Sequence, residues 1–110
     1  MSIEELKLSI NVGLTFDKPT VQSAIVKVDS GGFYYSIGPN GNTKKVTYVV
    51  LAQCLEQLQN TNTFSRAWFK EAFPSIEKAA PCSFTTIGGL FQYFNLASYE
   101  KGTYQKRSHV

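Results

Sequence analysis

The sequence is poor in the residues that catalysis and metal binding use most often. Its 110 residues include one histidine, His109, and two cysteines, Cys54 and Cys82. A Ser-His or Cys-His nucleophile would need an ordered chain end, and no group of His, Cys, Asp and Glu has the spacing of metal ligands. The glycine pairs in "SGGF" and "IGGL" lack the spaced glycines and the lysine of a phosphate loop. We therefore predict a protein that is not an enzyme and uses no metal or cofactor.

Charged residues and long apolar segments are also scarce. Charged residues make up 17% of the chain and hydrophobic residues 43%, which favours self-association as a homodimer. No segment approaches the ~18 apolar residues of a membrane span. The N-terminus lacks the basic start and apolar run of a secretory signal, and two cysteines without such a signal favour reduced thiols. We expect a single cytoplasmic domain over residues 1–110 that does not enter a membrane.

The N-terminal part, residues 1–43, has the pattern of an antiparallel meander of three or four strands. Apolar and polar residues alternate in "LKLSINVGLTF", from Leu6 to Phe16, which is the period of a strand. The segments "VQSAIVKVD" and "FYYSIG" follow after short turns. The pair Asn40-Gly41 favours a two-residue hairpin to "TKKVTYVV". Alternatively, Thr43 caps a helix; our interpretation is an extended segment through Thr47.

Three helices are predicted in residues 44–110. The first begins at about Tyr48 and has an apolar stripe at helical spacing. Ser65 caps the second helix, which ends at Pro74. The segment "SIEKAAPC" that follows is a loop or an extra turn of helix. Ser83 caps the third helix, "SFTTIGGLFQYFN", whose apolar face consists of Ile87, Leu90, Phe91 and Phe94. A short segment of one or two strands with a bend at Lys101-Gly102 ends the domain, so the predicted fold class is α+β.

This order of three helices and a basic two-strand segment resembles a winged helix-turn-helix domain between Val46 and Arg107. The resemblance assigns Tyr48–Gln59 to the first helix, Arg66–Phe73 to the second, Phe84–Phe94 to the recognition helix and Ser98–Arg107 to the wing. It implies a recognition helix in the major groove of DNA and a wing on phosphate or the minor groove.

A winged helix-like DNA-binding or transcription-accessory protein is therefore the first functional hypothesis. The net charge of +3 combines −1 over residues 1–43 with +4 over residues 44–110. The outer face of the third helix holds Thr85, Gly89 and Gln92 but no Arg or Lys, which favours close packing over base reading. The residues predicted to contact DNA are Lys44, Lys45, Arg66, Lys70, Thr85, Gln92, Lys101, Lys106 and Arg107.

Two other functions remain open from the sequence. A homodimeric interaction module would use aromatic surface and the two small residues of the third helix, where another backbone can approach closely. Its predicted interface residues are Trp68, Gly88, Gly89 and Tyr93. The other function is a small-ligand binder with an aromatic-lined pocket between the sheet and the helices.

Overall fold

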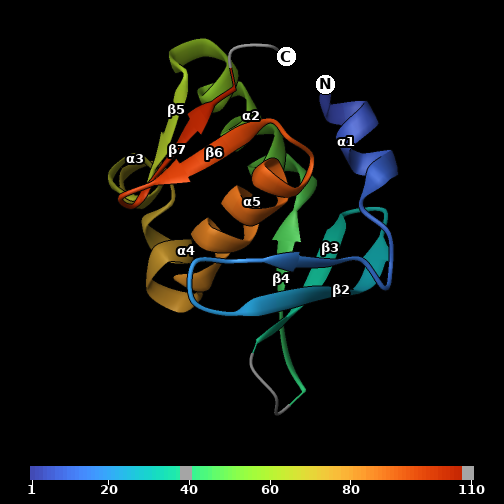
Figure 1. The fold of residues 1–110 in the computed structure, drawn as a ribbon. Helices are drawn as coiled ribbons and strands as arrows, with labels where there is room; N and C mark the ends of the chain where they lie inside the picture. The colour runs from blue at the N-terminus through green and yellow to red at the C-terminus, as the bar shows by residue number, and fades with distance from the viewer. Residues whose placement is uncertain (38–40, 108–110) are drawn as a thin grey trace.

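The computed structural model describes residues 1–37 and 41–107 and confirms the α+β class (Figure 1). Its strands form two antiparallel sheets, of order β1-β2-β3-β4 and β5-β7-β6, and its helices lie between and around these sheets. In chain order the elements are α1 (Ile3–Ser9), β1 (Thr15–Asp17), β2 (Gln22–Asp29), β3 (Gly32–Ile37), β4 (Asn42–Thr47), α2 (Tyr48–Thr61), β5 (Thr63–Ser65), α3 (Arg66–Ala72), α4 (Pro74–Ala79), α5 (Cys82–Tyr93), β6 (Ala97–Glu100) and β7 (Thr103–Lys106).

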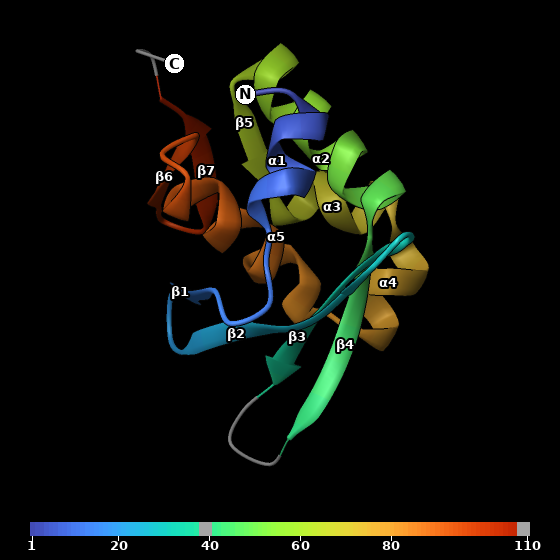
Figure 2. The same ribbon diagram turned by 90° about the vertical axis from the view of Figure 1, so that its right-hand side faces the viewer.

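The first sheet is the predicted meander. Strand β3 pairs with β2 on one side and with β4 on the other, and Ile37 lies opposite Asn42. The predicted pairing of "FYYSIG" with "TKKVTYVV" is thus confirmed, while the Asn40-Gly41 turn lies partly outside the described residues. The register of β2 shifts between Ile25 and Lys27, which indicates a β-bulge. The outer ends of β3 and β4 extend beyond the body of the molecule (Figures 1 and 2).

The prediction of a strand over Leu6–Phe16 was wrong for most of its length. Residues Ile3–Ser9 form α1, and only Thr15–Asp17 form a strand. Leu6 and Ile10 are buried, whereas Leu8 between them is 80% exposed. Positions four residues apart satisfy both a period of two and one face of a helix, so the alternating pattern did not separate the two structures.

A capping box starts α1 and was the sequence signal for this helix. The backbone N–H of Glu5 donates to the Ser2 hydroxyl at 3.2 Å, and the Ser2 N–H donates to the Glu5 carboxylate at 3.1 Å. Two of the N–H groups at the beginning of the helix are satisfied in this way. The N–H and hydroxyl of Ser2, in that order, hold the pKa of the Glu5 carboxyl below its usual value.

The helices of the C-terminal part begin close to their predicted positions. The Thr47 hydroxyl caps α2 by accepting from the Val50 N–H, and the Ser65 hydroxyl caps α3. The segment after Pro74 is a helix, α4. The predicted Ser83 cap was wrong, because α5 begins at Cys82 and the buried Ser83 hydroxyl contacts Tyr35 instead.

The predicted wing is a hairpin of β6 and β7. Lys101 and Gly102 both have positive φ, 49° and 86°, as a tight two-residue turn requires. Strand β5 pairs with the other edge of β7 and completes a three-stranded sheet. The three helices α2, α3 and α5, followed by a hairpin, are therefore present in the predicted order, with α4 between the second and the third.

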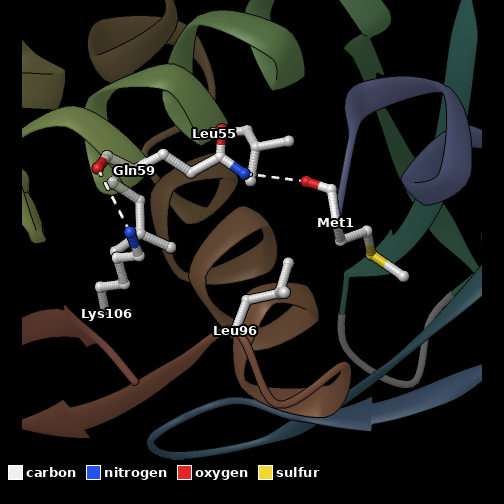
Figure 3. Close-up of a pocket in the computed structure, with 6 residues that line it drawn as sticks. Met1, Leu55, Gln59, Leu96 and Lys106 are labelled. Atoms are coloured by element: carbon white, nitrogen blue, oxygen red, sulfur yellow. Dashed lines mark hydrogen bonds between the residues drawn. The ribbon is translucent and has the colours of Figure 1, made fainter. Parts of the chain in front are cut away.

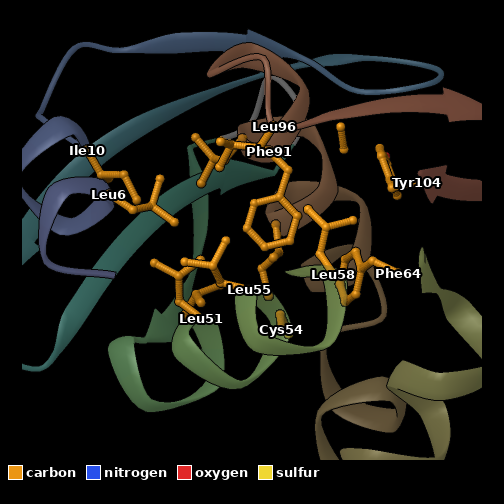
Figure 4. Close-up of a cluster of buried hydrophobic side chains, with 14 of the residues drawn as sticks. Leu6, Ile10, Leu51, Cys54, Leu55, Leu58, Phe64, Phe91, Leu96 and Tyr104 are labelled. Carbon is orange, nitrogen blue, oxygen red and sulfur yellow. The ribbon is translucent and has the colours of Figure 1, made fainter. Parts of the chain in front are cut away.

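One hydrophobic core joins the two parts of the chain (Figure 4). It contains Leu6 from α1, Ile10 just after this helix, Leu51 from α2, Phe91 from α5 and Tyr104 from β7, all at most 1% exposed. Burying one large apolar side chain contributes about 1.5–3 kcal/mol. Helix α5 lies at the centre of this arrangement, in contact with β1, α4 and β6.

The glycine pair of α5 allows close packing on two sides. A Cβ atom at Gly88 would overlap the ring of Tyr104. A Cβ atom at Gly89 would lie 2.9 Å from the carbonyl oxygen of Asp17 and 3.0 Å from the Phe16 ring. Hence Gly88 allows β7 to approach α5, and Gly89 allows β1 to approach it.

We expect Gly88→Ala to lower the free energy of unfolding by about 1–3 kcal/mol, the usual cost of overpacking a core. Urea denaturation measures this value. Gly31→Ala is the matched control, since its Cβ would meet only the flexible end of Lys45, at 3.4 Å, and the Asp29 carboxylate at 3.6 Å. A Gly88→Ala protein as stable as the wild type would contradict the packing of Tyr104 on α5.

Candidate nucleic-acid interface

Helix α5, the predicted recognition helix, is enclosed by the rest of the chain. Its middle residues are buried, with β1 against Gly89 and Tyr104 against Gly88. Of the remaining residues predicted to read DNA or lie near it, Thr85 is half-buried and Gln92 is exposed. A major groove about 12 Å wide admits a helix only when one side of the helix is accessible along its length. In this arrangement α5 presents no such side.

Polar contacts hold the first sheet against α5. The Lys18 ammonium, in the turn between β1 and β2, donates to the Thr86 hydroxyl at 3.0 Å. The Tyr35 hydroxyl of β3 lies 2.8 Å from the Ser83 hydroxyl and 3.1 Å from the Cys82 sulfur. Burial lowers the pKa of Lys18 and raises that of Tyr35. These polar groups satisfy one another's hydrogen bonds between the first sheet and α5, which gives them a structural role.

Arg66, one of the residues predicted to contact DNA, is engaged in hydrogen bonds within the protein. Its guanidinium donates to both oxygens of the Glu77 carboxylate, at 2.8 and 2.9 Å, and to the Pro81 carbonyl at 3.2 Å. It also lies 4.8 Å from the centre of the Phe84 ring. An arginine held by this carboxylate ties α3 to α4 and contributes little net charge to a phosphate site.

Four more of the basic residues predicted to contact DNA are Lys70, Lys101, Lys106 and Arg107, and three of them lie at the two ends of the hairpin. Lys101 is in the β6–β7 turn, and the pairing of Ser65 with Thr103 places this turn near the start of α3, which carries the exposed Lys70. Lys106 and Arg107 lie at the far end of β7. The structure does not bring these four residues together in one patch.

A more compact group of positive charges lies on the outer face of the first sheet. Lys27 on β2, Tyr34 on β3 and Lys45 on β4 are cross-strand neighbours in one row. Both ammonium groups lie 5.2 Å from the centre of the Tyr34 ring, within the range of a cation–π contact. We call this row, Lys27, Tyr34 and Lys45, the lysine face.

The lysine face has one basic neighbour and one acidic one. Lys44 is the cross-strand partner of Tyr35, so it lies on the other face of the sheet from the lysine face, and it is exposed. Asp29 accepts from the N–H groups of Gly31 and Gly32 and from the Lys45 ammonium at 3.2 Å. These contacts lower the pKa of Asp29, the Gly31 N–H being the largest cause, and the same ion pair raises the pKa of Lys45.

Lys27 is the residue that sequence reasoning missed. Its place in the row depends on the bulge between Ile25 and Lys27, which sets the side chains of β2 relative to those of β3. The alternation of Val26, Lys27 and Val28 shows that Lys27 lies on the opposite face of the sheet from the two valines. It does not show which residue of β3 lies beside Lys27. The sequence signal was therefore limited to the lysine pair of β4.

The predicted interface residues are not grouped either. Trp68 is half-buried and packs edge-on against Phe64 and Phe73. Tyr93, at the end of α5, is 50% exposed and contacts Phe94. The neighbours of Gly88 and Gly89 come from the same chain.

Within residues 1–37 and 41–107, no three His, Cys, Asp or Glu side chains gather in a way that could hold a metal ion. Both cysteines are free thiols. Burial raises the pKa of the Cys54 thiol. None of the helices in these ranges is long and apolar enough to span a bilayer.

Comparison with known proteins adds no relative: no family model, no curated sequence and no solved structure matches this chain.

The burial of Lys18 between the first sheet and α5 predicts that the contribution of this residue to stability depends on pH. Because burial lowers the pKa of folded Lys18, the unfolded chain binds this proton more tightly, and raising the pH then favours the folded state. We compare the free energy of unfolding of the wild type with that of Lys18→Met. The difference, wild type minus variant, should rise as the pH increases from the lowered pKa of folded Lys18 to the ordinary value of 10.5. It should not change with pH below or above this range. Urea titrations over this range measure the difference. A difference that stays constant or falls with pH would contradict the burial of the ammonium.

Proposed function

We propose that this protein binds the backbone of duplex DNA through the lysine face and Lys44, without reading the base sequence. The observation that carries the proposal is the row of Lys27 and Lys45 on either side of Tyr34. Two strand spacings of ~4.8 Å separate the two lysines by about 10 Å in the backbone. Lysine ammonium groups act as point charges toward phosphates, and such contacts are independent of sequence.

Two of the three lysines lie on β4, an edge strand of the first sheet. Lys45 lies two residues before Thr47, the N-cap of α2, and so at the end of β4 away from the free ends of β3 and β4 that extend outward in Figure 2. Lys44 and Lys45 are adjacent on the edge strand β4 and project to opposite sides of it. Their ammonium groups thus lie on both sides of an extended hairpin.

The enclosure of α5 supports the sequence-independent part of the proposal. Base edges are read by side chains that enter a groove. The helix that the winged helix resemblance assigns to this task is covered by β1 and β7. Tyr34 is half-buried, and the ammonium groups of two lysines lie close to its ring. Its ring therefore holds these lysines in place and is not free to stack on a base.

A salt titration tests the proposal directly. We expect fluorescence anisotropy with a labelled duplex to show binding at low salt, with log K falling against log salt at a slope of about −3. Each neutralised phosphate contributes about −0.9 to this slope. Three lysines are involved, of which Lys45 also has to leave its ion pair with Asp29. The variant K27Q/K44Q/K45Q should lose most of the affinity and most of the slope.

The matched control is K70Q/K101Q/K106Q, which removes the same charge from lysines outside the lysine face. At about 0.1–0.15 M salt this control should bind within about threefold of the wild type, because separated surface charges are then screened beyond a Debye length of about 8–10 Å. Equal losses in both variants would show that only net charge matters. Loss in the control alone would place the contact on the hairpin β6–β7 or on α3. Either result, or no binding at low salt, overturns the proposal.

Asp29 should weaken the interface by its charge. We expect Asp29→Asn to strengthen duplex binding several-fold, since Lys45 loses its ion pair while the Asn side-chain oxygen still accepts from Gly31 and Gly32. Asp17→Asn on β1 is the control with the same charge change, and its effect should be small. The same anisotropy titration measures both variants, and an equal gain in both would contradict a local role for Asp29.

A further inference from the structure

A small pocket lies between the end of α2, the beginning of the second sheet and the N-terminus, away from the lysine face (Figure 3). Its volume is about 140 Å³. Leu55 and Leu58 of α2 and Leu96, just before β6, form its apolar lining. These leucines are 3%, 1% and 6% exposed. The lining is therefore aliphatic, unlike the aromatic pocket that was one of the sequence hypotheses.

The rim of the pocket is polar and carries a positive charge. The Lys106 ammonium donates to the Gln59 carbonyl at 3.5 Å, and the Gln59 side chain donates to the Met1 carbonyl at 2.8 Å. Among the described residues that line this pocket, Lys106 is the one with a charged side chain, and Met1 carries the N-terminal ammonium group. Its contact with Gln59 is at the long limit for a hydrogen bond, and an ammonium has three donors. The rim thus offers donors and a positive charge above an apolar floor.

We propose that this pocket binds a small monocarboxylate with a branched aliphatic tail of four to six carbons. A dry cavity of about 150 Å³ holds a benzene molecule, so a volume of about 140 Å³ accommodates a tail of this size. The tail contacts Leu55, Leu58 and Leu96, and the carboxylate accepts from the Lys106 ammonium. A pocket that is mostly apolar with one convergent charged group is the usual form of a small-ligand site.

The probe is 4-methylpentanoate, compared with its neutral amide. Methyl-selective NMR of the full chain should show chemical-shift changes at Leu55, Leu58 and Leu96, with a dissociation constant of about 1 mM. The amide has the same shape but no charge, and it should bind about tenfold more weakly. Equal affinity for the two probes would overturn the proposal, as would the absence of shifts at these leucines.

Charge removal and pocket filling test the site independently. Lys106→Met keeps the apolar stem of the side chain without its charge and should weaken binding of the carboxylate about tenfold. Arg107→Met, which removes the neighbouring charge outside the pocket lining, should change it less than twofold. Leu96→Phe should block the tail of both probes. If that variant does not fold, the pair of charge variants still decides, because equal affinities in Lys106→Met and the wild type would overturn the proposal.

Discussion

The approach of β1 and β7 to α5 is the contact on which the rest of the structure depends. Both strands reach this helix at positions without a side chain, Gly89 and Gly88. The glycines cost about 0.5–1 kcal/mol each relative to alanine in a helix. Burial of Phe16 and Tyr104 against them offsets this cost, since a fully buried aromatic side chain contributes more than that. The sheet, the helix and the hairpin therefore share one core.

This contact also determines which surfaces are left for binding. A helix covered on two sides cannot enter a groove, although the surrounding elements follow the order of a winged helix. Exposed charge has to come from other elements, and the meander supplies it, because its outer face is not needed for the core. The proposed DNA contact and the enclosure of α5 are thus two consequences of the same packing.

Local signals in the sequence predicted the C-terminal helices better than the N-terminal segment. Thr47 and Ser65 lie immediately before apolar stripes of helical period, and both cap helices in the structure. In the N-terminal segment the period-two pattern and helical spacing coincide at Leu6 and Ile10, and the capping box of Ser2 was the signal that separated them. Ser83 shows the opposite case: it is a good capping residue whose hydroxyl contacts Tyr35 of a distant strand. Tertiary contacts of this kind are not visible in a local pattern.

The candidate binding surface was hardest to predict because charge was judged by segment. Residues 1–43 have a net charge of −1, yet they contain Lys27, which joins Lys45 on the lysine face. Their acidic residues are distributed over α1, β1 and β2, and only Asp29 contacts this face. A polyanion responds to charges within about a Debye length, ~8–10 Å, so the pairing of strands matters more than the total of a segment. The register of β2, which the bulge sets, is therefore what assembles the lysine face.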